Sequence, residues 1–334
     1  MTDPEVLFDV RGRVGVITLN RPRAINALNA GMCRAITDQL EQWRTDDAVE
    51  AIVVTGAGER GLCAGGDVKA VRQGVIDGDP HALDFFQLEF GMDGTLATYP
   101  KRVVGLMDGI VMGGGMGISA HADLRVATPR SKMAMPETGI GYFPDVGMMY
   151  PLSRAGNLGR HIALSGMPFG AGDAVAAGLA DVVVEDTEAV LDALEAEPML
   201  APEQLPGILD AEPELSDADW LSAYGADDPA AVVRALREHG SDAAQAVADT
   251  LVQRSPYTSA VTWMAMRAAK SKTLAQVLAQ DLHLVETVVR HHDFLEGVRC
   301  RLVDKGETPQ WQPATWEGVD LDEVRRLIDS APRD

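Results

Sequence analysis

Apolar runs and cysteines are both scarce in this 334-residue chain, and each scarcity excludes a class of protein. No stretch approaches the roughly 20 consecutive apolar residues that a transmembrane helix requires, so we expect no membrane association. The three cysteines (Cys33, Cys63 and Cys300) are odd in number and widely spaced, which excludes a disulfide framework and offers no metal-ligand spacing. The N-terminus also lacks the basic start and apolar core of a signal peptide. We therefore expect a reduced, cytoplasmic protein without a bound metal.

Basic residues are scarce as well. Lysine and arginine total 29 against 50 aspartates and glutamates, which gives a formal net charge of −21. Such a charge opposes binding to nucleic acid or to an acidic membrane surface. Residues 161–233 contain no lysine or arginine, which is typical of a solvated acidic face. An anionic ligand would have to meet one of the few basic clusters, such as Arg21 with Arg23 or Lys69 with Arg72.

Apolar patterning in the first half of the chain alternates between strands and helices. Residues 6–22 place β-rich segments around a polar Arg-Gly-Arg turn and predict a β-hairpin. Asn29 is placed to cap a helix whose apolar side chains recur with helical spacing. The further predicted elements are strands at 51–56, 103–109, 124–128 and 182–185 and helical segments at 79–96 and 172–180. This alternation indicates α/β layering up to about residue 190.

The second half of the chain is predicted to be mainly helical. Prolines recur every few positions in residues 190–235, which favours a linker or lid over a core segment. Residues 230–256 and 273–303 then follow with strong helical periodicity. The predicted organisation is a core at 1–190 and a mainly helical region at 191–334, which would supply a lid, packing or oligomer contacts.

Three glycine-rich segments follow predicted strands. GAGERG (56–61) matches the dinucleotide pattern G-x-G-x-x-G, but neither a helix at its third glycine nor a second strand ending in an acid follows, so a nucleotide site is not expected. LCAGGD (62–67) and MGGGMGIS (112–119) each lead into a segment with helical character. If these two loops converge, they offer two backbone N–H groups to one oxygen, as in an oxyanion hole. Each loop taken alone is better explained as a tight turn, and Cys63 as a packed, inert thiol.

Two acids lie in the segment MPETGIGYFPDVG (135–147), among glycine, proline and aromatic residues. A buried carboxylate costs free energy unless it is paired or hydrogen-bonded, so Glu137 and Asp145 need an explanation. Catalysis is one explanation, and a satisfied structural acid is the other. Tyr142 and Phe143 either line a pocket or pack in the core.

These motifs together resemble the crotonase (enoyl-CoA hydratase/isomerase) superfamily, and within it the 3-hydroxyisobutyryl-CoA hydrolases. The resemblance extends over nearly the whole chain, from ITLNRPRAINALN (17–29) to DFLEGVRCRLVDKGETPQWQPA (293–314). It implies an α/β fold, a crotonase-like spiral of repeated ββα units with strands in two sheets, followed by a helical C-terminal region. It also implies an acyl-CoA substrate, no cofactor apart from the coenzyme A of that substrate, and a homo-oligomer that could be a dimer, trimer or hexamer.

By the same resemblance, the backbone N–H groups of Gly66 and Gly114 bind the thioester oxygen of the substrate. A side chain at either position would obstruct the approach of the thioester, which accounts for the glycines. The remaining substrate-binding residues that the resemblance implies are Ala64, Asp67 and Val68 in the first loop, Arg23 and Lys69 at the phosphates of coenzyme A, and the acid Glu89. Alternatively, Glu89 is an ordinary exposed glutamate on a helix.

The positions of the catalytic acids distinguish the hydratase and hydrolase subfamilies. Hydratases of the superfamily use two glutamates, of which one corresponds to Glu137, whereas the other position holds Gly117 here. The hydrolases carry P-E-x-x-I-G-x-F-P-D, which is intact at 136–145. The resemblance therefore makes Glu137 the main catalytic carboxylate and Asp145 its helper. Glu137 either attacks the thioester carbonyl or activates a water molecule, and the sequence leaves both roles open.

This interpretation leaves three functional hypotheses. The first is hydrolysis of a 3-hydroxyacyl-CoA thioester, with 3-hydroxyisobutyryl-CoA of valine catabolism as the expected substrate. The alternative is an enoyl-CoA hydratase or isomerase of fatty-acid β-oxidation, which Gly117 opposes. The third is an acyl-CoA-binding scaffold without turnover, which the retention of Glu137 and Asp145 opposes.

Overall fold

The computed structural model describes residues 3–332, which form two compact units. The first unit comprises the described chain up to Asp67 together with Gln87–Ala134 and Phe169–Glu214. The second comprises Val68–Phe86, Met135–Pro168 and the chain from Leu215 onward. This division differs from the predicted one at residue 190, because the chain passes between the units several times.

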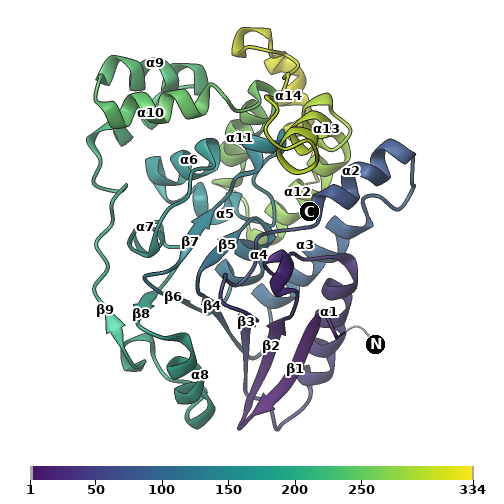
Figure 1. Cartoon of the computed structure of the whole chain (residues 1–334), viewed down its shortest axis with the longest axis vertical. Coiled ribbons are helices and arrows are strands. Elements are labelled where there is room, and N and C mark those ends of the chain that lie inside the picture. Colours follow the sequence, from purple (N-terminus) through teal and green to yellow (C-terminus); the bar gives the residue numbers. More distant parts are fainter. Residues whose placement is uncertain (1–2, 333–334) are drawn as a thin grey trace. The chain divides into compact units, whose positions relative to one another are not determined.

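A seven-stranded sheet forms the centre of the first unit (Figure 1), in the order β1-β2-β3-β4-β6-β8-β9. The pairs β1/β2 and β8/β9 are antiparallel, and the pairs between β2 and β8 are parallel. The strands are β1 (Val6–Arg11), β2 (Val14–Leu19), β3 (Ala51–Gly56), β4 (Arg102–Met107), β6 (Leu124–Ala127), β8 (Val182–Val184) and β9 (Ile208–Leu209). The predicted hairpin and the four further predicted strands are confirmed. Parallel neighbours require crossover connections, which explains the alternation of strands and helices in this part of the sequence.

A second, two-stranded sheet pairs β5 (Ile110–Met112) with β7 (Lys132–Ala134) in parallel. These two strands are not predicted from the sequence, because three residues are too few to show a periodic pattern. They matter for the site, since β5 ends at the second glycine loop and β7 ends just before the acidic segment.

The sequence predicts a side-chain cap at the start of one helix of the first unit, and the structure confirms it. The Asn29 side chain accepts a hydrogen bond from the Met32 N–H (2.9 Å), and the apolar face of the helix that follows is buried, as predicted. The helical elements are η1 (Pro22–Ala24), α1 (Ala30–Arg44), α3 (Asp84–Ala97, of which the first three residues belong to the second unit), α4 (Gly114–Ala120), α7 (Ala171–Ala176), α8 (Thr187–Ala196) and η3 (Pro202–Gln204).

The prediction of a linker or lid at 190–235 is wrong for the first part of that segment. Val190, Leu191 and Leu194 of α8 are buried in the same apolar cluster as strand residues such as Val104 and Val126. Leu205 joins this cluster beyond the prolines. Proline stops regular helices but does not prevent the residues between from packing, so the segment belongs to the core of the first unit.

The second unit is helical, and the predicted helical C-terminal region is confirmed. In Figure 1, α9 (Pro229–His239) and α10 (Asp242–Leu251) lie side by side. The other helical elements are α2 (Val68–Asp77), η2 (Glu137–Ile140), α5 (Met149–Leu152), α6 (Gly156–Ser165), η4 (Asp219–Gly225), α11 (Pro256–Ala269), α12 (Leu274–Val288), α13 (His292–Val298), η5 (Arg299–Val303), η6 (Trp316–Gly318) and α14 (Leu321–Asp329). No helix among the described residues combines the length and apolar character needed to cross a bilayer.

Candidate active site

The two predicted glycine loops converge at β5 in the first unit. The Cys63 N–H donates a hydrogen bond to the Ile110 carbonyl (3.1 Å), and the Met112 N–H donates one to the Cys63 carbonyl (2.9 Å). The first loop thus runs along β5 like a short additional strand. A Cβ atom on Gly65 would lie only 3.7 Å from the Gly114 nitrogen, so the two loops are in direct contact.

The N–H groups of Gly66 and Gly114 donate no hydrogen bond to any described residue. In the first loop the next N–H, that of Asp67, is occupied, because it donates to the Leu28 carbonyl (3.0 Å). Gly114 is the first residue of α4, where a helix offers its N–H groups no internal acceptor. The two predicted oxyanion donors therefore lie on adjacent loops with their N–H groups unoccupied, which is the arrangement that can polarise a carbonyl oxygen.

A buried acid borders the second loop. Glu89 of α3 is only 2% exposed, and its Oε1 lies 2.2 Å from the place that a Cβ on Gly114 would occupy. The alternative of an exposed helix glutamate is therefore wrong. Asp93 follows one helical turn later and is also fully buried. No motif marks Asp93 in the sequence, although its spacing of four residues from Glu89 would place both acids on one helix face.

The other predicted contacts of the first loop have mixed outcomes. The Ala64 N–H donates to the Ile25 carbonyl (2.9 Å), so the N–H groups of Ala64 and Asp67 are not available to a ligand. Val68 is half-buried at the start of α2. Arg23 and Lys69 are exposed and make no hydrogen bond or ion pair with the described residues, and their role at the phosphates stays a prediction.

Cys63 lies within the first loop but is not a nucleophile. The thiol is fully buried, and loss of solvent raises its pKa to about 12. A thiol with so high a pKa carries almost no thiolate at neutral pH. The predicted inert, packed cysteine is confirmed.

The two predicted acids of the 135–147 segment lie close together in the second unit. Glu137 opens η2 and is 6% exposed, and Asp145 is 5% exposed. The Tyr142 hydroxyl donates a hydrogen bond to Asp145 Oδ2 (3.0 Å). Glu137 Oε2 makes no hydrogen bond with the described residues. A buried carboxylate oxygen without a donor is costly to a structure, so the purely structural explanation does not account for Glu137.

Burial raises the pKa values of both acids. The pKa of Glu137 is raised well above its ordinary value, first by desolvation and then by the negative charge of Asp145. The pKa of Asp145 is also raised by desolvation, against the opposing effect of the Tyr142 hydrogen bond. Two interacting acids titrate as a pair, and raised pKa values bring that pair closer to the pH at which a general base works best.

We expect the activity of this pair to be lost in mildly acidic solution. A base or nucleophile must be ionised, and the raised pKa values mean that protonation occurs above the ordinary carboxyl range of about 4. The acid limb of log kcat/KM for thiol release should therefore lie clearly above pH 4 and shift to a lower pH in Asp145→Asn, which removes the neighbouring charge. An acid limb at about pH 4 in both proteins would contradict this assignment.

Tyr142 and Phe143 pack in the core of the second unit. Their rings are 4.5 Å apart, and the Tyr142 ring lies 5.7 Å from those of Phe86 and Phe294. Of the two alternatives in the sequence analysis, core packing is therefore correct. Tyr142 also holds Asp145, which links this packing to the site.

Gly141 of the same segment is expected to tolerate no side chain. Its φ is +69°, and a Cβ would lie 2.0 Å from the Asp293 carbonyl oxygen on α13. Gly156 has a similar φ of +62° but nothing within 4 Å of its Cβ position. We predict that G156A lowers the free energy of unfolding by about 1–2 kcal/mol from the left-handed backbone alone. G141A should lose about 1–3 kcal/mol more from the clash. Equal losses for both variants in urea denaturation would exclude this contact.

One histidine, His161, lies in the interior of the second unit. His161 is fully buried, with Nδ1 2.9 Å from the Tyr224 hydroxyl, and burial lowers its pKa to about 4. Between residues 3 and 332 no cluster of three or more His, Cys, Asp or Glu side chains is arranged to hold a metal ion.

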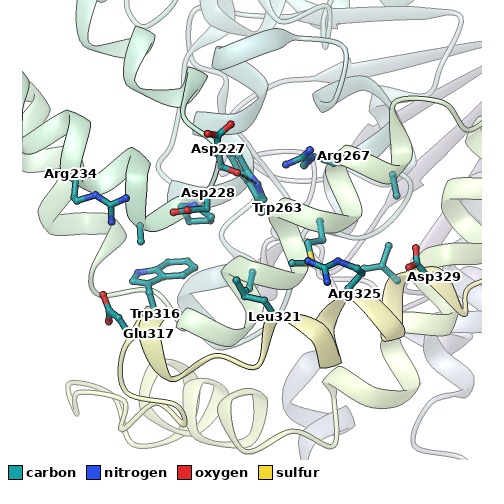
Figure 2. Close-up of a pocket in the computed structure, with 16 residues that line it drawn as sticks. Asp227, Asp228, Arg234, Trp263, Arg267, Trp316, Glu317, Leu321, Arg325 and Asp329 are labelled. Carbon is teal, nitrogen blue, oxygen red and sulfur yellow. Dashed lines mark hydrogen bonds between the residues drawn. The ribbon is translucent and has the colours of Figure 1, made fainter.

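A separate cleft of 680 Å³ lies in the second unit among α9, α11 and α14 (Figure 2). Trp263 and Trp316 are prominent in its lining. Two of its charged groups have local partners: Asp228 caps α9 through the Ala231 N–H, and Arg325 pairs with Asp322. No predicted site residue lines this cleft, so it is not the candidate active site.

Two adjacent free N–H donors beside a buried acid, on an α/β fold with buried carboxylates, define an enzyme of the crotonase type. The chain belongs to the enoyl-CoA hydratase/isomerase family, whose family profile matches residues 14–328. The fold class and the family resemblance are therefore confirmed.

Relatives cover nearly the whole chain. Proteins from Danio rerio and Rattus norvegicus are 36% and 37% identical to it, and each alignment covers 98% of this chain and 90% or 89% of the relative. Both are named 3-hydroxyisobutyryl-CoA hydrolase, mitochondrial. A structure described as a carnitinyl-CoA dehydratase from Mycobacterium thermoresistibile is 40% identical, with a TM-score of 0.93 over 99% of this chain and 98% of that one. A structure described as an enoyl-CoA hydratase from Rhodobacter sphaeroides is 34% identical, with a TM-score of 0.91 over 97% of each chain.

Proposed function

We propose that this protein hydrolyses 3-hydroxyisobutyryl-CoA to 3-hydroxyisobutyrate and coenzyme A, a step of valine catabolism. The observation that carries the proposal is the pair of unoccupied N–H groups of Gly66 and Gly114 on adjacent loops. The names of the curated relatives support the choice of substrate and reaction. The raised pKa values of Glu137 and Asp145 support the presence of a base or nucleophile near neutral pH.

In the proposed reaction, the N–H groups of Gly66 and Gly114 bind the thioester oxygen and stabilise the negative charge that develops on it. One such donor is worth about 2.7–4 kcal/mol of transition-state stabilisation. Glu137 either takes a proton from the attacking water or attacks the carbonyl carbon itself to form a mixed anhydride that water then cleaves. In both routes the carbon–sulfur bond breaks and the sulfur leaves as the coenzyme A thiol. In the general-base route the water oxygen enters the acid product. In the anhydride route water attacks either the acyl carbonyl, with the same result, or the Glu137 carbonyl, which leaves the water oxygen in Glu137 and a Glu137 oxygen in the product. Asp145 binds the 3-hydroxyl group or tunes the pKa of Glu137.

Covalent connectivity supports the action of the glycine loops and Glu137 on one substrate. β5 and β7 are parallel and pair Met112 with Ala134. Gly114 follows two residues after Met112, and Glu137 follows three residues after Ala134. Three residues of extended chain span at most about 10 Å. The chain that leads to Glu137 therefore leaves the small sheet at the same end as the chain that leads to Gly114.

A second candidate function is hydration or dehydration of an enoyl-CoA, which the descriptions of the two similar solved structures favour. The second hydratase glutamate would fall at Gly117 of α4, and Gly114–Ala120 contains no carboxylate. A water molecule flanked by two glutamates therefore cannot be assembled in the family's usual way. The substrate preference, the cytoplasmic location, the contacts to the phosphates and a homo-oligomeric state remain predictions from the sequence.

The experiment that separates the two functions measures two products on the same enzyme sample. Free thiol release from 3-hydroxyisobutyryl-CoA reports hydrolysis, and loss of the enoyl absorbance of crotonyl-CoA reports hydration. Thiol release without hydration is the expected result. Hydration without thiol release would overturn the proposal in favour of the hydratase. Label found in the Glu137 side chain after a single turnover in heavy-oxygen water would establish the anhydride route, because water oxygen enters that carboxylate only when water cleaves a mixed anhydride at the Glu137 carbonyl.

A further inference from the structure

Asp281 is a fully buried acid to which the proposed mechanism assigns no role. It interrupts the apolar face of α12, where Leu284 and Val285 are also fully buried. Its Oδ2 accepts a hydrogen bond from the Gly147 N–H (2.9 Å), whereas Oδ1 makes no hydrogen bond with the described residues. Because a buried acid with only one engaged oxygen costs free energy, the site calls for a function. No motif marks it in the sequence, although an acid on an otherwise apolar helix face is a visible signal.

The backbone that Asp281 holds belongs to the turn that carries Asp145. Val146 has a φ of +50°, a left-handed conformation that a β-branched residue rarely adopts, and Gly147 has a φ of +75°. The Met148 N–H donates to the Asp145 carbonyl (2.9 Å) and closes the turn. A residue in such a conformation costs about 1–3 kcal/mol and persists only when its surroundings enforce it. The bond from Asp281 acts at the centre of this strained turn.

The surroundings of Asp281 favour its protonated form. Its pKa is raised well above the ordinary value, first by burial and further by the charge of Asp145. The Gly147 hydrogen bond and the charge of Lys272 act in the opposite direction. A neutral carboxyl group can still accept the Gly147 hydrogen bond with one oxygen, and it avoids full like-charge repulsion against Asp145.

We propose that Asp281 is a positioning residue: through Gly147 it holds the strained 145–148 turn and thereby fixes the carboxylate of Asp145 relative to Glu137. The inference rests on the proposed function only in treating Asp145 as part of the catalytic pair. Asp281 itself contacts no substrate in this scheme.

Three variants of Asp281 and Asp145 test the proposal by thiol release. D281L removes the acceptor and should lower kcat by about 10–100-fold with little change in KM, because misplacement of a reacting group by about 1 Å costs up to this factor. D281N is neutral, has nearly the same shape and retains an acceptor oxygen, so it should keep kcat within about threefold of the wild type. In a D145N background, D281L should cause little further loss, because the residue that it positions is already disabled. A D281L effect of equal size in both backgrounds, or a D281N as impaired as D281L, would overturn the proposal.

A second measurement does not depend on activity. Hydrogen exchange at the Gly147 amide should be protected in the wild type and in D281N, and at least about tenfold faster in D281L or, should that variant fold poorly, in D281A. L278A on the same helix should lower stability but leave both the Gly147 protection and kcat unchanged, because Leu278 does not contact the turn through a hydrogen bond. If the wild type releases no thiol, the proposed function fails, and the Gly147 exchange alone then decides whether Asp281 holds the turn. Unchanged protection in D281L and D281A would overturn the inference.

Discussion

Glu137→Gln should lower thiol release from 3-hydroxyisobutyryl-CoA by about 10²–10⁴-fold, the usual contribution of a positioned general base, or by more if Glu137 is the nucleophile. Glutamine has the shape of glutamate but can neither take the proton from water nor form an anhydride. The measurement is kcat for free thiol, with the loss expected in kcat rather than in KM, because the N–H groups of Gly66 and Gly114 still bind the thioester.

The same substitution should stabilise the folded protein at neutral and alkaline pH. Because the folded-state pKa of Glu137 is raised, the folded state binds this proton more tightly than the unfolded state does. The free energy of unfolding therefore falls as the pH rises from the unfolded pKa of about 4.3 through the raised folded value. Removal of the ionisable group abolishes this loss, so E137Q should be more stable than the wild type at pH 8 and no more stable at pH 4. An inactive protein that is also more stable cannot be explained by misfolding.

Glu286→Gln is the matched control for this experiment. Glu286 is exposed on α12, so the same chemical change there should leave both kcat and the pH dependence of stability unchanged. If E137Q retains thiol release within about tenfold of the wild type, Glu137 is not the catalytic carboxylate, and the assignment of the site to the 135–147 segment fails.

Gly114→Ala should lower kcat/KM by about 10²–10³-fold, as expected for the loss of one oxyanion donor. The added methyl group would lie 2.2 Å from Glu89 Oε1 and 3.3 Å from Leu28 Cδ1, so either the loop or the Glu89 side chain must move. Movement of the loop displaces the free Gly114 N–H, and the methyl group itself narrows the approach of the thioester. We therefore expect both weaker substrate binding and slower turnover.

Gly91→Ala provides the comparison, because Gly91 lies on α3, the helix that also carries Glu89, with nothing within 4 Å of its Cβ position. It should leave activity unchanged and stabilise the helix by about 0.5–1 kcal/mol. A G114A enzyme with wild-type kcat/KM would show that the second glycine loop does not bind the oxyanion. A double variant with Glu89→Ala is informative too: it removes the clash, so activity that returns in it would identify sterics rather than the N–H geometry as the cause.

Local sequence patterns were sufficient to predict most helices and strands of the first unit. The hairpin of β1 and β2, the Asn29 cap and the buried face of α1 depend on residue spacings of two and of three to four, which the sequence displays directly. The very short strands β5 and β7 show no such period, and their pairing follows from neighbours that are distant in the sequence. The 190–214 segment was assigned wrongly for the same reason, since burial of Leu205 depends on the sheet beneath it and not on the prolines beside it.

The candidate site divides in the same way. The sequence by itself singled out the two glycine-rich loops and the acids Glu137 and Asp145, because glycines let a loop backbone approach a ligand and an acid in an apolar turn is conspicuous. The family resemblance then implied Gly66 and Gly114 as the donors within those loops. Only the tertiary structure decided that the N–H groups of Gly66 and Gly114 are free while those of Ala64 and Asp67 are occupied, since hydrogen-bond acceptors come from distant segments. It alone showed that Glu89 is buried against Gly114 and that Asp281, 136 residues beyond Asp145, accepts a hydrogen bond from Gly147 in the turn that follows Asp145. Charge, desolvation and hydrogen bonding depend on distances in space, and these distances cannot be read from the separation of residues along the chain.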